Sequence, residues 1–146
     1  VKGPQVMSGY WEIEKDDDDH PFTEDGWFHT GDIATISSQG QIKILDRLKD
    51  MIIISGFNVY PSEVEDLIVK HPDVSECGVC AFIDESGSEN VKAFIVRNNP
   101  DISALKIQDY CHEHLTHYKV PKYIEFTDEL PKSPIGKILR RKLKSH

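Results

Sequence analysis

Lys137 is the residue whose surroundings most clearly suggest chemistry. It ends the segment LPKSPIGK (residues 130–137), in which two prolines and a glycine predict a loop, and an apolar and basic stretch over residues 138–144 then predicts a short helix. A lysine side chain is a compact positive charge on a flexible stem, which suits a site where negative charge gathers on a phosphoryl group. The alternative interpretation is a solvated basic tail, which this segment alone does not exclude.

Asp32 closes a second segment with chemical potential, GWFHTGD (residues 26–32). A carboxylate beside a flexible turn can accept two hydrogen bonds from a ribose diol, as acidic residues do in other nucleotide sites. Aspartate and glycine are also common turn residues, so a capped turn is the competing interpretation of this segment.

A third segment, DRLKD (residues 46–50), places charged residues where the sequence pattern changes, and it leads through MIII to SGFNVYPSEVE (residues 55–65). Charged residues at a domain boundary can form a hinge, in which a few backbone dihedrals absorb a large rotation. Arg47 offers a planar, permanently charged fork suited to a ribose or phosphate, and Gly56 permits close approach of the backbone to a ligand. The alternative is an exposed linker followed by a strand, a turn and a helix.

The elements that must position these segments fall into two parts. Residues 1–45 read as short strands and turns, with a predicted hairpin formed by residues 33–37 and 41–45. That part is too small to form a good core alone, so we expect it to belong to a larger body. After the charged segment, strands and helices alternate. We expect strands at about 51–55, 74–83, 91–96 and 120–126, with helices from Pro61 to near His71, over 103–117 and over 138–144.

This order predicts an α+β fold in which a short sheet is covered by helices. We expect residues 1–45 to be a strand-rich remnant of a large N-terminal domain, residues 46–50 to be a hinge, and residues 51–146 to be a mobile C-terminal domain.

Charge and hydropathy exclude several classes of protein. The net charge of −8 argues against nucleic acid as the main partner. No apolar run approaches the roughly 18 residues that a membrane span needs, and no signal peptide is evident, so we expect a cytoplasmic location. The acidic run Asp16–Asp19 is interpreted as a solvated loop.

The cysteines and histidines do not form a recognisable metal pattern. A structural zinc site usually needs two C-x-x-C pairs or a matching histidine pair, whereas this chain has one such pair, Cys77 and Cys80, in a segment that reads as a buried strand. An odd cysteine count without a secretion signal suggests free thiols. Cys111 is interpreted as a further free thiol. Because His112, His114 and His117 lack the i, i+4 spacing of a metal-binding helix face, we interpret them as surface or hydrogen-bonded histidines and expect no metal site.

Taken together, these segments resemble one family. The chain is similar over essentially its whole length to the adenylate-forming superfamily, and most of all to bacterial long-chain fatty-acid–CoA ligases. The resemblance rests on VKGPQVMSGYW (residues 1–11), on the three segments described above in that order, and on HYKVPK (residues 117–122).

The resemblance implies a role for each candidate residue. Asp32 would bind the ribose hydroxyls of AMP, and Arg47 would assist at the same nucleotide. Lys49 would lie at the hinge, and Lys137 would be the catalytic lysine of adenylation. Gly56 would approach the pantetheine arm of CoA in a second step.

The implied activity is ATP-dependent synthesis of acyl-CoA from a fatty acid and CoA, with ATP, AMP, CoA and Mg²⁺ as ligands of the full-length enzyme. The phosphate loop, the magnesium-site glutamate and the acyl tunnel would lie outside this chain, so we expect the chain alone to be inactive. Peripheral association with the inner face of the cell membrane and dimerisation of the isolated chain fit the same picture. The alternatives are an aryl-CoA ligase, an adenylation domain that loads a carrier protein, and a stand-alone interaction module without catalytic activity.

Overall fold

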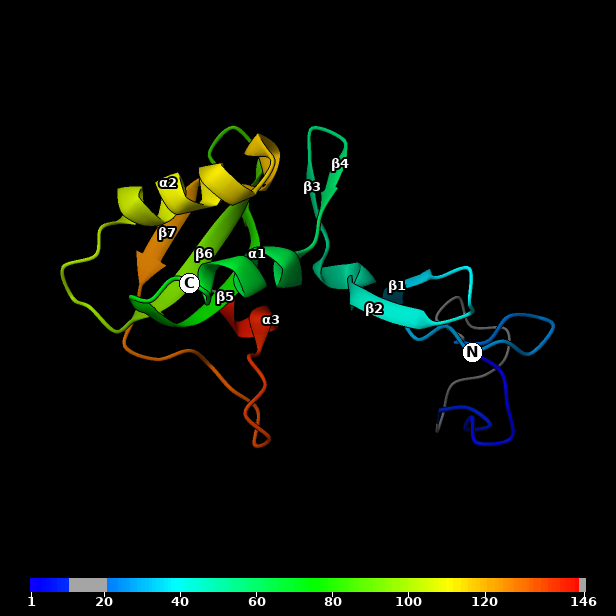
Figure 1. Ribbon diagram of the computed structural model, residues 1–146. Coiled ribbons are helices and arrows are strands. Elements are labelled where there is room, and N and C mark those ends of the chain that lie inside the picture. Colours follow the sequence, from blue (N-terminus) through cyan, green and yellow to red (C-terminus); the bar gives the residue numbers. More distant parts are fainter. Residues whose placement is uncertain (11–20, 145–146) are drawn as a thin grey trace.

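The computed structural model describes residues 1–10 and 21–144. The predicted acidic loop at Asp16–Asp19 therefore lies outside the described residues. Figure 1 shows two lobes, a smaller one around β1 and β2 and a larger one around the β5–β6–β7 sheet, joined by the segment that follows β2. The architecture is a small α+β fold with short sheets, as the sequence predicts.

The smaller lobe is organised by an antiparallel hairpin. Strand β1 (Asp32–Ile36) pairs with β2 (Ile42–Arg47), which confirms the predicted hairpin to within two residues at each end. The turn is closed by hydrogen bonds between Ser37 and Gln41, and Gly40 has a positive φ of 79° that favours glycine. Ile36 and Ile42 face each other in this register, and both are exposed.

A second hairpin begins the larger lobe. Strand β3 (Ile52–Ile54) pairs with β4 (Phe57–Val59) through the two-residue turn Ser55–Gly56. Both turn residues have positive φ, 50° and 85°, and such turns match the right-handed twist of paired strands. Strand β4 has no signal in the sequence, because three residues between a glycine and a helix are too few to show alternation.

The main sheet has three strands in the order β5–β6–β7. Strand β5 (Val74–Ile83) is antiparallel to β6 (Glu89–Arg97), and β7 (Tyr123–Phe126) is parallel to β6. A parallel pair needs a long crossover, which here contains α2 (Ala104–His114). The predicted strand over 120–126 is shorter than expected and begins only at Tyr123, because Val120 caps the 3₁₀ helix η2 (His117–Lys119) and Pro121 has no amide to donate to a strand ladder.

Helices α1 (Pro61–Ile68) and α2 cover one face of this sheet. Pro61 stands at the first helical turn of α1, where its missing N–H costs nothing, and the Ser103 side chain caps α2 by accepting from the Lys106 amide at 3.3 Å. The core between helices and sheet consists of fully buried side chains that include Val64, Ile68, Val79, Ile95 and Ile107. Within the described residues, every buried hydrophobic side chain lies between Ile52 and Leu143.

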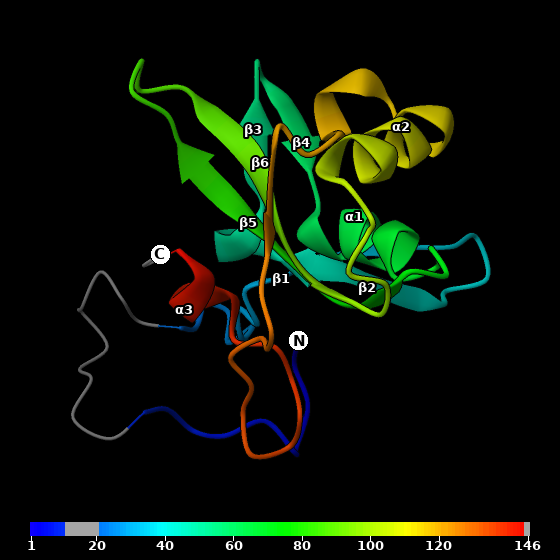
Figure 2. The same cartoon turned by 90° about the vertical axis from the view of Figure 1, so that its left-hand side faces the viewer.

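The opposite face of the sheet carries α3 (Arg140–Leu143), and Figure 2 shows α3 on the other side of β5 from α1 and α2. Leu130 and Leu143 pack there against Cys80 and Phe94. Gly78 of β5 makes this possible, because a Cβ atom at that position would lie only 2.7 Å from Cδ1 of Leu143. The helix predicted over residues 138–144 is thus a single turn, since the preceding residues form an extended bridge.

Candidate functional site

A cleft of about 830 Å³ lies between the smaller lobe and the loop that precedes α3. Its walls include Asp32 at the start of β1, Arg47 at the end of β2, Lys49 and Lys137. The structure therefore brings four of the five predicted site residues to one cavity, although they are far apart in the sequence. The volume lies within the range of small-molecule sites, about 300 to 1,000 Å³.

Lys137 is held by a small closed loop. The backbone amide of Ser133 donates to the Lys137 carbonyl at 2.8 Å, and the Lys137 amide donates back to Oγ of Ser133 at 3.1 Å. Gly136 has a φ of 80° at the tip, and Lys132 and Ile138 form an antiparallel bridge at the base. The backbone of Lys137 is thus fixed, while its side chain is exposed at the cleft.

Asp32 and Arg47 form an ion pair across the β1–β2 ladder. They are directly opposite each other in the register, and Nε of Arg47 lies 3.2 Å from Oδ1 of Asp32. The amide of Asp32 also donates to Oγ1 of Thr30 at 3.2 Å. The Arg47 side chain is half exposed and that of Asp32 about a quarter exposed, so both remain accessible from the cleft.

Lys49 lies in η1 (Leu48–Asp50), a single 3₁₀ turn between the two lobes. The amide of Leu48 donates to the Gly31 carbonyl at 2.8 Å, which attaches the start of this turn to the smaller lobe. Lys49 itself is exposed, and the buried part of the larger lobe begins at Ile52. The change from one lobe to the other thus takes place within a few residues around Lys49.

Arg140 and Asp46 also line the cleft, although neither is among the residues predicted for the site. The guanidinium of Arg140 donates to Oδ1 of Asp46 at 2.6 Å and to both carboxylate oxygens of Glu65 at 2.9 and 2.5 Å. The exposed-linker interpretation of residues 46–50 is wrong at its first residue, because Asp46 is only 5% exposed. One signal in the sequence pointed to this contact: an arginine lies on the single helical turn that follows Lys137. A charged side chain that is buried there needs a partner of opposite charge.

Several interactions determine the ionisation of this pair. Burial alone would raise the pKa of Asp46, but hydrogen bonds from the Ser62 and Arg47 amides, together with the charge of Arg140, lower it. Burial alone would likewise lower the pKa of Arg140, but the carboxylates of Glu65 and Asp46 raise it. Both groups are therefore charged at neutral pH.

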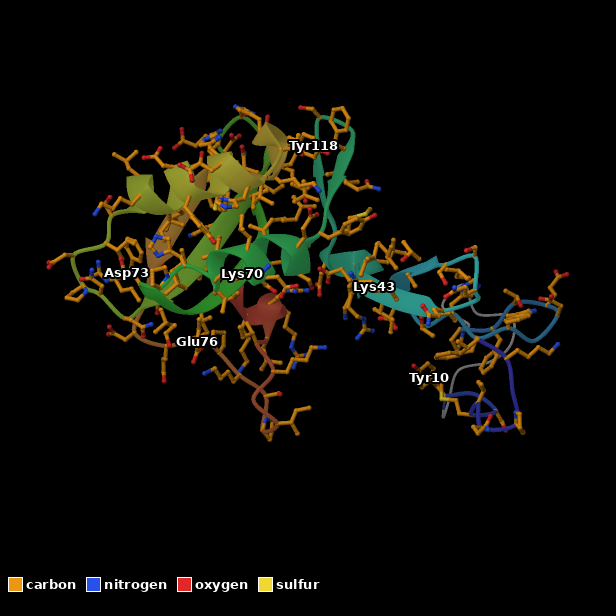
Figure 3. The ribbon with its side chains drawn as sticks, viewed as in Figure 1. Tyr10, Lys43, Lys70, Asp73, Glu76 and Tyr118 are labelled. Carbon is orange, nitrogen blue, oxygen red and sulfur yellow. The ribbon has the colours of Figure 1, made fainter. Side chains whose placement is uncertain are left out.

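Gly56 is placed outside the cleft. It lies at the exposed tip of the β3–β4 hairpin, and its backbone conformation is one that other residues rarely adopt. Next to it, Phe57 stacks on Tyr118 with ring centroids 4.8 Å apart, and Figure 3 shows Tyr118 beside this hairpin. Any ligand that uses Gly56 and any ligand that uses Lys137 would thus meet different faces of the larger lobe.

The charges of the cleft favour an anionic ligand that also has hydroxyl groups. Lys137, Lys49 and Arg47 supply cationic donors, which suit phosphate oxygens, while Asp32 supplies an acceptor for hydroxyl groups. A nucleotide has both kinds of group. The donor set of the cleft therefore fits an adenylate.

Metal and membrane features are limited in the part of the chain that the structure describes. There, no three or more His, Cys, Asp or Glu side chains converge as metal ligands, and no helix has the length and apolar character to cross a membrane. The predicted strand interpretation of Cys77 and Cys80 is confirmed: both are buried on β5, on opposite faces of the sheet. His112, His114 and His117 are exposed, as the sequence analysis expected.

Comparison with known families identifies the class of this chain. Residues 63–137, just over half of the chain, match the family of AMP-binding enzyme C-terminal domains. The chain belongs to this family, and it thus contains a C-terminal domain of the adenylate-forming enzymes.

The similar curated proteins include CoA ligases. A long-chain-fatty-acid–CoA ligase of Escherichia coli is 49% identical over 144 residues, which cover 99% of this chain and 25% of that protein. A 2-succinylbenzoate–CoA ligase of Bacillus mycoides is 40% identical, with 99% and 29% covered. This chain therefore spans only a quarter to a third of the length of these relatives.

The similar solved structures include ATP-bound MatB from Rhodopseudomonas palustris. It is 35% identical, with a TM-score of 0.90 over 99% of this chain and 29% of that one. Because the match covers nearly the whole chain, it includes both lobes. Their relative placement here is thus similar to that in a chain that holds ATP.

Proposed function

We propose that this chain is the C-terminal portion of an ATP-dependent fatty acyl-CoA synthetase. In the first half-reaction, a fatty carboxylate oxygen attacks the α-phosphorus of ATP, the bond to the β-phosphate breaks, and acyl-AMP and pyrophosphate form. In the second, the CoA thiol sulfur bonds to the acyl carbon, AMP leaves, and the thiol proton passes to solvent. The chain supplies the hinge and the adenylation lysine of that enzyme.

One observation carries the proposal: Lys137 lines the same cleft as Asp32 and Arg47. Two parts of the site that the sequence separates widely meet at a cavity of suitable size for a nucleotide. The similarity of the lobe arrangement to an ATP-bound chain supports the same conclusion.

In this proposal, Asp32 accepts hydrogen bonds from the ribose hydroxyls of AMP. Arg47 orients that carboxylate through their ion pair and contacts the same nucleotide. Lys137 stabilises the negative charge that develops on the phosphoryl oxygens during adenylation. A positioned charged donor of this kind contributes about 3 kcal/mol, or a factor of 100 to 1,000 in rate.

The second half-reaction requires a different arrangement of the lobes. Rotation about Lys49 withdraws Lys137 from the cleft and presents the β3–β4 hairpin to the acyl-adenylate. Gly56, which has no side chain to obstruct a ligand, then lies against the pantetheine arm of CoA. The separate positions of Gly56 and Lys137 on the larger lobe support the assignment of these two residues to different half-reactions.

The proposed domain organisation follows the same logic. Residues 1–45 are part of a large N-terminal domain, residues 46–50 are the hinge, and residues 51–146 are the mobile C-terminal domain. Exposed isoleucines at positions 36, 42 and 44 of the β1–β2 hairpin support a missing partner surface for the first part. The Mg²⁺ site and the acyl pocket belong to the N-terminal domain in this proposal, so the isolated chain has no ligase activity and its exposed hairpin favours dimerisation.

The location proposed for the full-length enzyme is the cytoplasm, with peripheral access to the membrane from which fatty acids are drawn. The alternatives to this proposal differ mainly in the class of acid that the enzyme activates. An aryl-CoA ligase is the second candidate, because a 2-succinylbenzoate–CoA ligase is 40% identical to this chain. The greater identity to fatty-acid ligases favours the fatty acyl assignment.

A substrate panel tests this assignment. The full-length protein that carries this chain is incubated with ATP, CoA and either fatty or aromatic acids, and pyrophosphate and thioester are measured. We expect acyl-CoA from long-chain fatty acids. Activity only with aromatic acids would replace the assignment by an aryl-CoA ligase, acylation of a carrier protein would indicate a loading domain, and no adenylation with any acid would favour the non-catalytic module.

A further inference from the structure

Asp46 is the only buried charged residue in the described part of the chain, and its bonds lead away from its own lobe. Its Oδ2 accepts from the Ser62 amide of α1 at 2.8 Å, and its Oδ1 accepts from Arg140 of α3 at 2.6 Å. Only its contact with the adjacent Arg47 amide, also 2.8 Å, is local. Asp46, a residue of β2, is therefore hydrogen-bonded to two helices of the larger lobe.

Along the backbone, by contrast, Asp46 belongs to the smaller lobe, because the chain passes to the larger lobe only after Leu48. Leu48 is still attached to the smaller lobe through the hydrogen bond of its amide with the Gly31 carbonyl. Asp46 precedes Leu48 and pairs with Ile33 in the β1–β2 ladder, so its backbone is part of the smaller lobe. A rotation located after Leu48 must separate Asp46 from Ser62 and Arg140.

Arg140 has a second partner that such a rotation would not affect. Glu65 and Arg140 both lie in the larger lobe, and Glu65 holds the guanidinium through two hydrogen bonds. Oε1 of Glu65 also accepts from the Val79 amide at 2.8 Å, which fixes the carboxylate on β5. Rotation of the lobes would thus leave Arg140 paired with Glu65 and would break its bond to Asp46.

We propose that Asp46 and Arg140 form a conformation-specific latch, a positioning pair that holds the lobes in the arrangement where Lys137 faces Asp32 and Arg47. This inference rests on the proposed function. Arg140 follows Lys137 by three residues, so the latch acts directly on the segment that carries the lysine. Release costs the buried bonds of Asp46 but leaves no unpaired charge on Arg140, which makes the latch reversible.

The latch predicts an unequal effect on the two half-reactions. In the full-length ligase, Asp46→Asn removes the charge and replaces one acceptor oxygen by an NH₂ group that opposes a donor. We expect pyrophosphate release from ATP and fatty acid to slow about tenfold or more, since charge-assisted hydrogen bonds are lost. Thiolysis of supplied acyl-adenylate by CoA should keep its rate or become faster.

Glu63→Gln is the matched control. It removes an ion pair of α1 with Lys119 (2.7 Å) that lies entirely within the larger lobe, and we expect both half-reactions to stay unchanged. Equal losses in both half-reactions of Asp46→Asn, or no loss in either, would overturn the latch. Failure of the proposed function can be distinguished from failure of the latch. In the first case the unmodified protein itself would release no pyrophosphate from ATP when fatty acid is added.

Hydrogen exchange provides a measurement that needs no variant. The Ser62 amide, bonded to Asp46, should exchange slowly in the unmodified ligase with an acyl-sulfamoyl-adenosine bound, and faster once CoA is added. The Glu63 amide, which donates to the Tyr60 carbonyl at 3.0 Å within the larger lobe, is the internal reference. Unchanged exchange at Ser62 on addition of CoA would contradict the latch.

Discussion

Asp32 and Arg47 occupy opposite positions of the β1–β2 ladder and form an ion pair of 3.2 Å in the wall of the cleft. Adjacent strands thus place an acceptor and a cationic donor side by side, with fixed spacing. The pair is partly exposed, so its contribution to stability is small, and we interpret its value as orientation of the carboxylate toward a ligand.

Replacement of Asp32 should therefore affect binding more than stability. We expect Asp32→Ala in the full-length ligase to weaken ATP and AMP binding about 10- to 100-fold, because hydrogen bonds from two ribose hydroxyls to a carboxylate are lost. Calorimetric titration with AMP measures this. Asp66→Ala, at an exposed carboxylate on α1, should leave AMP binding unchanged; an equal loss in both variants would remove Asp32 from the nucleotide site.

Gly78 should control the packing of α3 and, through it, the position of the Lys137 loop. We expect Gly78→Val to destabilise the protein by about 1 to 3 kcal/mol, because the new side chain would occupy the space of Leu143 and Ile138. Ser75→Val, at an exposed position of the same strand, is the control and should cost little. Chemical denaturation of the full-length protein measures both, and equal stability of the two variants would show that α3 adapts without strain.

The cysteines should be unreactive in the native state. Burial raises the pKa of the Cys111 thiol to about 11, and burial likewise raises the pKa values of Cys77 and Cys80. We expect iodoacetamide at pH 8 to leave all three unmodified in the folded protein and to alkylate them after denaturation, as measured by mass spectrometry. Rapid alkylation of any of them in the native protein would show that the β5 or α2 packing opens readily.

The Asp46–Arg140 latch should also have a definite dependence on pH. Because the pKa of Asp46 is lowered in the folded state, its contribution to stability is present above its unfolded value of about 4 and is lost as the pH falls through the lower folded value. The difference in unfolding free energy between the unmodified protein and Asp46→Asn should thus be constant from about pH 6 to 8 and shrink in strong acid. A difference that instead grew on acidification would mean that Asp46 is protonated in the native state.

Much of the larger lobe could be predicted from the sequence because its elements carry strong local signals. Strand β5 was predicted with its observed ends, and the positions of Pro61 and Ser103 gave the starts of α1 and α2. The short elements were less predictable. Strand β4 and the single turn of α3 depend on tertiary contacts, the latter on the space above Gly78, which no local pattern reveals.

The candidate site, like the fold, could be predicted only in part from the sequence. Asp32, Arg47, Lys49 and Lys137 were selected from their segments and the family resemblance, and the structure brings them to one cleft. The burial of Asp46 was not predicted, because a charged residue in a charged segment is normally solvent-exposed. Only the fold shows that α1 and α3 converge on it and supply two hydrogen-bond donors, the Ser62 amide and the Arg140 guanidinium. The adjacent Arg47 amide is a third donor.

The most direct test of the central claim is to measure both half-reactions of the full-length ligase with Lys137→Ala. We expect pyrophosphate release from ATP and fatty acid to fall about 100- to 1,000-fold, while thiolysis of supplied acyl-adenylate by CoA keeps its rate. Lys142→Ala, at an exposed lysine of α3, should change neither. Equal loss in both half-reactions with Lys137→Ala, or unimpaired adenylation, would contradict the role of this lysine.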